Sequence, residues 1–201
     1  MRQKIVFLIP GFRHKIGQKG YSLLRKTLVS EGFRVVPIAV PWKGSTITDN
    51  TTFFLKKYNE KLAKLSLLSK DVYLLGFSYG ALVAFLAATK IPVRGLVLCS
   101  LSPFFKEDLP KTLPKNSSAL QIIRHKTFAS LYSNKLAKKI KAKSVCMLYG
   151  EKESTVLINR SKKTFRAIAS KKKYLFSIQK TDHAISDKKY INAIQFATTF
   201  L

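Results

Sequence analysis

Residues 74–85 read LLGFSYGALVAF: a short apolar run, a serine between two glycines, and a second apolar run. The first run, which begins at Val72, has the continuous hydrophobicity of a strand buried on both faces. The second run, over residues 81–88, is rich in Ala and Leu and predicts a packed helix. The stretch therefore predicts a sharp turn between a strand and a helix, with Ser78 at its centre.

The spacing of the two glycines fits the G-x-S-x-G pattern, here Gly76-Phe77-Ser78-Tyr79-Gly80. A strained turn at the serine brings the flanking positions close to neighbouring backbone, where a Cβ would clash. The same turn exposes the hydroxyl and aims the following N–H groups, with the helix N-terminus, at a developing negative charge. A glycine-bounded turn without chemistry is the alternative interpretation. The strand–turn–helix context favours a reactive Ser78.

The composition is that of one folded domain. The chain has 201 residues and 46% hydrophobic content, enough for a single domain over residues 1–201 with a sizeable core. No apolar run is long enough to span a bilayer. The apolar stretch 4–9 is too short for a signal-peptide core and is expected to be the first strand. Cys99 and Cys146 lie in apolar runs, which predicts buried, reduced thiols and a cytoplasmic location.

The net charge is unusual. Lys and Arg number 37 against 10 Asp and Glu, which gives a formal net charge of +27. Such a chain is expected to associate with anionic lipid or nucleic acid, unless lysine merely fills solvent-exposed positions. The excess runs along the whole chain and is dense at residues 134–143. No zinc finger, aromatic RNA-binding motif or basic zipper is visible, so the charge is taken to influence location rather than chemistry.

Strand and helix patterns alternate along the chain. In the segment 51–69, Phe54, Tyr58 and Leu62 share one helical face, and Pro37 places its strand at a sheet edge or bulge. This alternation predicts an α/β fold with six mainly parallel strands and helices on both faces. The expected strands are 4–9, 33–40, 72–77, 93–100, 143–150 and 173–179. The other expected helices are 21–30, 118–139, 155–169 and 187–200.

A serine nucleophile needs a base, and the base needs an orienting acid. Sites in parallel sheets lie beyond the carboxyl ends of the strands, where Ser78 is expected. Of the three histidines, His14 lies near the end of the first strand, and His125 lies in a predicted helix where a solvated surface role is expected. His183 follows the last strand in the acidic loop KTDHAISD. His183 is therefore the expected base.

The acid is chosen from ten carboxylates. Those on helices, at a strand start, or beside the histidine in sequence are poorly placed to hold its far nitrogen. The candidates that follow the fourth and fifth expected strands are Glu107, Asp108, Glu151 and Glu153. Glu153 stands just before an expected helix, where capping or a helix-terminal charge is an equally open role.

At this point the residues resemble the α/β-hydrolase superfamily over nearly the whole chain. That family runs nucleophile, acid, histidine in chain order, and Ser78, Glu153 and His183 repeat that order. Its acid is commonly found in G-x-x-D, two strands beyond the nucleophile, where this chain has GEKE at 150–153. The resemblance implies Glu153 as the acid, with Glu151 and Asp108 as rivals.

The resemblance also implies an oxyanion hole. The family usually carries His-Gly and an apolar residue after the first of these strands, whereas this chain has Pro10-Gly11-Phe12. The donor would be the backbone N–H of Phe12, which needs no histidine side chain, and the second donor the N–H of Tyr79. The family usually has eight strands, so the chain resembles a trimmed six-strand core without a large cap. Serine at the elbow disfavours dehalogenases and dienelactone hydrolases.

The activity implied by the resemblance is that of a serine hydrolase, which cleaves a carboxylic ester or thioester through an acyl-enzyme and needs no metal or organic cofactor. Phe104 and Phe105 are expected to line the acyl pocket; alternatively they cover the core. Thioesterase, lysophospholipase, peptidase and acyltransferase activities all stay open. A second class is a hydrolase-fold binding protein with little or no catalysis, recruited to anionic membrane or nucleic acid by its basic surface.

Overall fold

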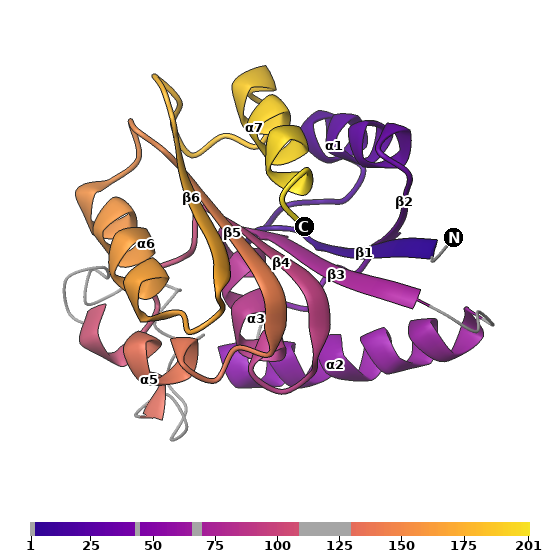
Figure 1. Ribbon diagram of the computed structural model, residues 1–201, viewed down its shortest axis with the longest axis horizontal. Helices are drawn as coiled ribbons and strands as arrows, with labels where there is room; N and C mark the ends of the chain where they lie inside the picture. The colour runs from indigo at the N-terminus through magenta and orange to yellow at the C-terminus, as the bar shows by residue number, and fades with distance from the viewer. Residues whose placement is uncertain (1–2, 43–44, 66–69, 109–129) are drawn as a thin grey trace.

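The apolar runs predicted as strands form one parallel sheet of six strands, in the order β2-β1-β3-β4-β5-β6 (Figure 1). The computed structural model describes residues 3–42, 45–65, 70–108 and 130–201. The strands are β1 (Gln3–Ile9), β2 (Phe33–Pro37), β3 (Lys70–Phe77), β4 (Val93–Cys99), β5 (Ala142–Gly150) and β6 (Lys172–Ile178). The α/β architecture predicted from the sequence is confirmed.

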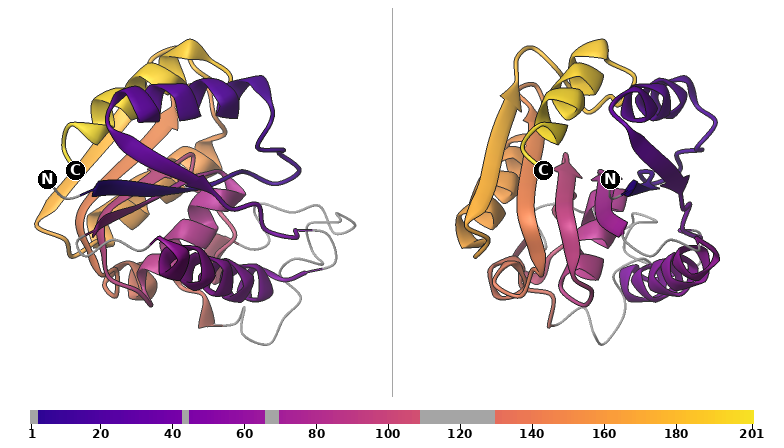
Figure 2. Two further views of the ribbon diagram at one scale, coloured as in Figure 1. Left: turned by 90° about the vertical axis from the view of Figure 1, so that its right-hand side faces the viewer. Right: turned by 45° about the vertical axis from the view of Figure 1, so that its right-hand side comes forward.

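Helices cover both faces of the sheet, which explains the continuous hydrophobicity of its strands. The helices are α1 (Lys19–Ser30), α2 (Ile47–Lys64), α3 (Tyr79–Ala88), α5 (Ser133–Ala137), α6 (Thr155–Ala167), α7 (Lys188–Thr198) and the 3₁₀ helix η1 (Lys106–Asp108). Figure 2 shows α1 and α7 side by side on one face and α2 on the other. On β3, Leu74 packs into the core on the α2 and α3 side, and Leu75 into the core under α1 and α7.

The strand order reverses between β1 and β3. The chain runs from β1 outward to β2, returns past β1 to form β3, and then proceeds outward through β4, β5 and β6. In an open parallel sheet, the crevice beyond the carboxyl ends of the strands at such a reversal is the usual site for a ligand. Ile9 of β1 lies beside Gly76 of β3 at this point, and Ser78 follows directly.

The connection from β3 to α3 is a single residue. Ser78 stands alone between them, with φ +55° and ψ −118°, a conformation that costs on the order of 1–3 kcal/mol for a residue with a side chain. A Cβ on Gly76 would overlap the backbone of Gly80, and a Cβ on Gly80 would overlap the carbonyl oxygens of Ile9 and Pro10. The predicted need for glycine at both positions is confirmed.

Several predicted boundaries shift for local reasons. Helix α2 begins at Ile47, not at residue 51, because Thr46 and Asp49 form a capping box with reciprocal side-chain to backbone hydrogen bonds. Strand β2 ends at Pro37, not at residue 40, and is an edge strand as that proline indicates. His125 and much of the helix predicted at 118–139 lie outside the described residues. Within the described part of that range, residues 133–137 form the short α5.

We expect Gly80→Ala to lower the free energy of unfolding by about 3 kcal/mol or more, because the added methyl group meets fixed backbone of β1. Gly17→Ala is the matched control, since a Cβ there has no atom within 4 Å. Urea denaturation followed by circular dichroism measures both variants. Equal stability of the two variants would contradict the packing argument.

Candidate active site

Ser78 lies beyond the carboxyl end of β3 and is fixed by its backbone. Its N–H donates to the carbonyl oxygen of Cys99 at 2.8 Å, which ties the turn to the end of β4. Its Oγ lies 2.8 Å from Nε2 of His183 and 3.3 Å from Oγ of Ser102. The hydroxyl therefore points at an imidazole nitrogen rather than at backbone.

His183 reaches Ser78 from the loop between β6 and α7. Its ring packs against the ring of Phe77, with centroids 4.9 Å apart, and its side chain is 40% exposed. Nδ1 lies 3.1 Å from Oε1 of Glu153. One face of the imidazole is thus held by an aromatic ring while its two nitrogens contact a hydroxyl and a carboxylate.

Glu153 lies in the turn between β5 and α6, and its side chain is fully buried. A buried carboxylate needs hydrogen-bond donors, and Ser100 supplies one by donating its Oγ–H to Oε1. Because the hydroxyl of Ser100 has a single proton, it accepts from the hydroxyl of Tyr190. Burial raises the pKa of Tyr190 well above its ordinary value, so this phenol keeps its proton. The buried hydroxyls of Tyr190 and Ser100, hydrogen-bonded in sequence, therefore orient the carboxylate of Glu153.

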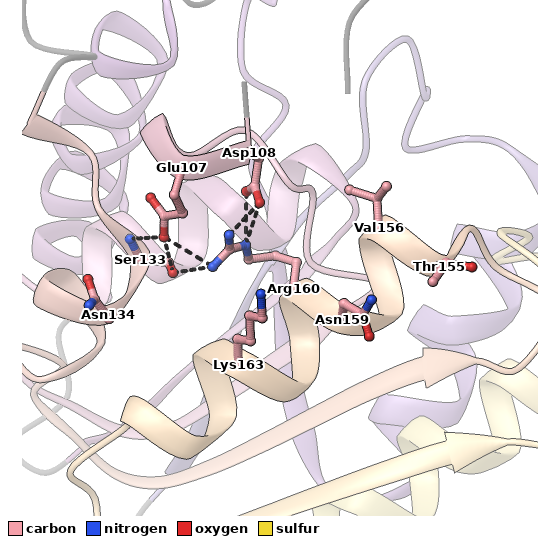
Figure 3. Close-up of a pocket in the computed structure, with 9 residues that line it drawn as sticks. All are labelled: Glu107, Asp108, Ser133, Asn134, Thr155, Val156, Asn159, Arg160 and Lys163. Carbon is pink, nitrogen blue, oxygen red and sulfur yellow. Dashed lines mark hydrogen bonds and ion pairs between the residues drawn. The ribbon is translucent and has the colours of Figure 1, made fainter. Parts of the chain in front are cut away.

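The rival acids have other roles. Asp108 is buried and accepts hydrogen bonds from Nε and Nη2 of Arg160, a residue of α6 (Figure 3). Glu107 contacts Nη1 of the same guanidinium and accepts from Ser133. These residues line a cavity of about 440 Å³ between η1, α5 and α6.

Glu151 is exposed in the turn after β5. Of the three acid candidates that the sequence leaves open, Glu153 alone contacts His183 in the described part of the chain.

The two expected oxyanion donors lie in segments that the packing of Gly80 brings together. Tyr79 opens α3, and Phe12 lies in the loop after β1, with its ring 6.0 Å from that of Tyr79. Neither backbone N–H donates to an acceptor in the described residues. The first N–H groups of a helix have no partner within it and carry its positive dipole, so this position suits a negative charge.

A buried tyrosine holds the loop that carries Phe12. The hydroxyl of Tyr21 accepts from the N–H of Gly11 at 2.8 Å and lies 2.9 Å from Nδ1 of His14. Burial raises the pKa of Tyr21, so the phenol stays protonated and donates to Nδ1. The pKa of His14 is lowered mainly by burial and, to a smaller extent, by the nearby His183. The lowered pKa favours the neutral ring that this hydrogen bond requires. One hydroxyl therefore ties both ends of the loop around Phe12.

The two phenylalanines after β4 differ from one another. Phe105 is fully buried, packs edge-on against Phe85 with centroids 5.4 Å apart, and lies under the guanidinium of Arg160. Its assignment to an acyl pocket is corrected: it covers the core, which was the alternative interpretation. Phe104 is half-buried and stays a candidate pocket residue.

Little in the sequence pointed to the supporting residues Ser100, Ser102, Tyr190, Tyr21 and His14. Ser100 and Ser102 follow a strand, which is the one signal that could have placed them near the site. Ser100 also has a positive φ of +51°, which no sequence pattern announced. The tyrosines lie inside helices α1 and α7, where an apolar core role is the natural prediction.

No family model matches the sequence, and no curated protein matches it. Solved structures do match. Est1E from Butyrivibrio proteoclasticus superposes with a TM-score of 0.79 at 17% identity, over 98% of this chain and 85% of that one. The chain has the α/β-hydrolase fold.

Two further structures share the α/β-hydrolase fold with the chain. The Pyrococcus furiosus esterase Pf2001 gives a TM-score of 0.72 at 17% identity, over all of this chain and 82% of that one. A monoacylglycerol lipase from Paleococcus ferrophilus gives 0.68 at 18% identity, over 96% and 91%. The predicted resemblance is confirmed at the level of the fold.

The two cysteines, the acidic and histidine side chains and the helix lengths bear on a disulfide, a metal site and a membrane span. Cys99 and Cys146 are buried and form no disulfide, and burial raises the pKa of Cys146 to about 12. Within the described ranges, no three His, Cys, Asp or Glu side chains lie close enough to hold a metal ion. Among the described helices, none has the length and apolar character needed to cross a membrane.

We expect Tyr21→Phe to slow the labelling of Ser78 by a fluorophosphonate on the order of tenfold, because loosening an oxyanion donor loses part of the 10²–10³ that removing one costs. The matched control is Tyr58→Phe, a buried phenol whose hydroxyl bonds no described residue. Labelling rates are followed by intact-protein mass spectrometry. Equal rates for the two variants would show that the Tyr21 hydroxyl does not support the site.

Proposed function

We propose that this protein is a serine hydrolase that cleaves a carboxylic ester or thioester through a covalent acyl-enzyme. The observation that carries the proposal is the continuous chain of contacts from Ser78 Oγ to His183 Nε2, at 2.8 Å, and from His183 Nδ1 to Glu153 Oε1, at 3.1 Å. Nucleophile, base and orienting acid within hydrogen-bond reach are the arrangement that serine acyl transfer requires.

In the first half-reaction, Ser78 Oγ attacks the carbonyl carbon as its proton moves to Nε2 of His183. The carbonyl oxygen becomes an oxyanion, which accepts from the N–H groups of Phe12 and Tyr79 at the N-terminus of α3. When the tetrahedral intermediate collapses, the imidazolium returns the proton to the leaving alcohol or thiol. Ser78 is then acylated, and His183 is neutral again.

In the second half-reaction, His183 takes a proton from water, whose oxygen attacks the acyl carbon. Collapse of the second intermediate expels Ser78 Oγ, which regains the proton, and releases the carboxylic acid. The buried carboxylate of Glu153 selects the Nδ1–H tautomer and stabilises the imidazolium in both halves. Ser100 and Tyr190 keep that carboxylate directed at Nδ1.

The names of the structural neighbours support ester chemistry. The Pyrococcus furiosus protein is named an esterase, Est1E carries the prefix Est, and the Paleococcus ferrophilus protein is named a monoacylglycerol lipase. These proteins share 17–18% identity with the chain, so their names support a small-molecule ester as the substrate class and leave the particular ester open.

A second candidate is a hydrolase-fold binding protein recruited to a polyanion. The net charge of +27 favours it, as does a hollow of about 490 Å³ at the amino ends of β4, β5 and β6. Arg94, Lys143, Lys171 and Lys172 line that hollow, at the sheet edge opposite Ser78. The two candidates differ in one property, the reactivity of Ser78.

We expect Ser78→Ala to abolish hydrolysis of short p-nitrophenyl esters, with a loss of several orders of magnitude in kcat and an unchanged circular dichroism spectrum. The parent protein should be labelled stoichiometrically at Ser78 by a fluorophosphonate. Turnover that survives in Ser78→Ala would overturn the nucleophile assignment. A folded parent protein that is neither labelled nor active would favour the binding protein.

We expect Glu153→Gln to lower kcat by as much as ~10⁴, because the amide keeps the shape but loses the charge that stabilises the imidazolium. Glu151→Gln, at an exposed position, is the control and should match the parent. Asp108→Asn should lower the free energy of unfolding by about 3 kcal/mol, since it leaves Arg160 buried with less compensation. Its turnover per folded molecule should stay near the parent value. If Asp108→Asn is folded but inactive, then Asp108 is the acid and the assignment to Glu153 is wrong.

A further inference from the structure

Arg13 lies in the loop after β1, on an aromatic platform formed by Phe12 and Trp42. Its guanidinium carbon is 5.3 Å from the centre of the Phe12 ring and 5.9 Å from that of Trp42. The two rings contact each other, with centroids 4.8 Å apart. A guanidinium over two aromatic faces is held by cation–π attraction and loses little further freedom on binding an anion.

The platform is tied to the reacting centre. The Phe12 ring packs edge-on against Tyr79, whose hydroxyl accepts from the buried side chain of Asn50 at 2.8 Å. Phe12 and Tyr79 are the residues whose N–H groups face the developing oxyanion in the proposed reaction. Arg13, as the residue after Phe12, therefore stands beside the position of the ester carbonyl.

The backbone fixes the start of the Arg13 side chain. Its φ is +61°, in the left-handed region that side chains rarely adopt, and residues held there gather at functional sites. The next residue, His14, donates its N–H to the carbonyl oxygen of Gly11, and its ring is held by Tyr21. The turn that directs Arg13 outward is thus held at both ends.

Within the described ranges, no ion pair joins Arg13 to a carboxylate. The ion pairs of the described residues involve Lys57, Arg160 and His183, and Arg13 pairs with none of their carboxylates. The side chain is exposed, so a bound anion can reach its guanidinium. A guanidinium offers parallel N–H donors, which match the two oxygens of a carboxylate or phosphate.

We propose that Arg13 binds an anionic group carried by the substrate, so that the preferred substrates are esters or thioesters bearing a carboxylate or phosphate near the scissile bond. The inference rests on the proposed ester chemistry of Ser78 and adds the substrate class. The contact is made with a substrate group that does not react, so we take it to be equally strong before and during the reaction. It therefore lowers KM more than it raises kcat.

The test compares two esters of equal chain length, mono-(4-nitrophenyl) adipate, which carries a terminal carboxylate, and neutral 4-nitrophenyl hexanoate. The quantity measured is the ratio of their kcat/KM values, which cancels the general competence of each variant. Arg13→Gln replaces the guanidinium with a shorter, uncharged amide and should lower the ratio on the order of tenfold, mainly through the KM of the adipate, because it removes a charge-assisted pair. Hexanoate turnover should stay near the parent value.

Two further variants sharpen the comparison. Arg13→Asn should give the same loss, and asparagine adopts a positive φ readily, so that the turn is preserved. Arg34→Gln removes one exposed charge from β2 and controls for attraction by the net charge. All assays use 0.15 M NaCl, where charges more than about 8 Å apart are largely screened.

The possible results distinguish a failure of the proposed anion binding by Arg13 from a failure of the proposed ester hydrolysis by Ser78. A parent protein that hydrolyses neither ester overturns the proposed function and this inference together. A parent that hydrolyses both, with a ratio that Arg13→Gln and Arg13→Asn leave within about twofold, overturns the anionic substrate class alone. An equal drop in Arg34→Gln also overturns it, because net charge would then explain the preference.

Discussion

The contact between the first turn of α3 and the end of β1 is the constraint on which the rest of the site depends. Gly80 lies against the carbonyl oxygens of Ile9 and Pro10, so tightly that a methyl group has no room. Because α3 begins there, β3 must connect to it through one residue, and Ser78 takes a positive φ with its hydroxyl raised. The same contact sets the loop that carries Phe12 beside the helix N-terminus. One packing contact thus places Ser78 and the two N–H groups proposed as oxyanion donors.

The strand order converts this local geometry into a hydrogen-bonded chain across the sheet edge. β3, β4, β5 and β6 are neighbours in sequence order, and each is followed by one member of the site: Ser78, Ser100, Glu153 and His183. The carboxylate of Glu153 is buried and receives donors from two sides, which limits its rotamers. Tyr190 extends the chain into the core beneath α7. The orientation of the imidazole therefore depends on how strands β3 to β6 and helix α7 pack together.

Charged side chains in the interior are few and paired, whereas the excess of positive charge lies at the surface. In the described part of the chain, the buried charged side chains are Asp108, Glu153 and Arg160, and each has a partner. Arg160 binds η1 to α6 and closes the side of the domain next to Phe105. The positive excess lies outside, where Arg13 differs from the exposed lysines because its guanidinium is held on two rings. The large positive charge of the chain is therefore carried at the surface, and the single buried cation among the described residues, Arg160, is paired with a carboxylate.

The sequence by itself determined the six strands, the turn at Ser78, and the place of His183 after the last strand, because periodicity and the steric needs of glycine are local properties. It left Glu153, Glu151 and Asp108 open, since each follows a strand. The tertiary structure gives them different contacts: Asp108 pairs with Arg160, a residue far along the chain, and Glu153 lies within hydrogen-bond reach of His183. Ser100, Tyr21 and Tyr190 were ordinary polar or core residues in the sequence, and Phe105 resembled a pocket residue as much as Phe104 did. Which hydroxyl meets which partner depends on how separate elements pack, and no local pattern encodes that contact.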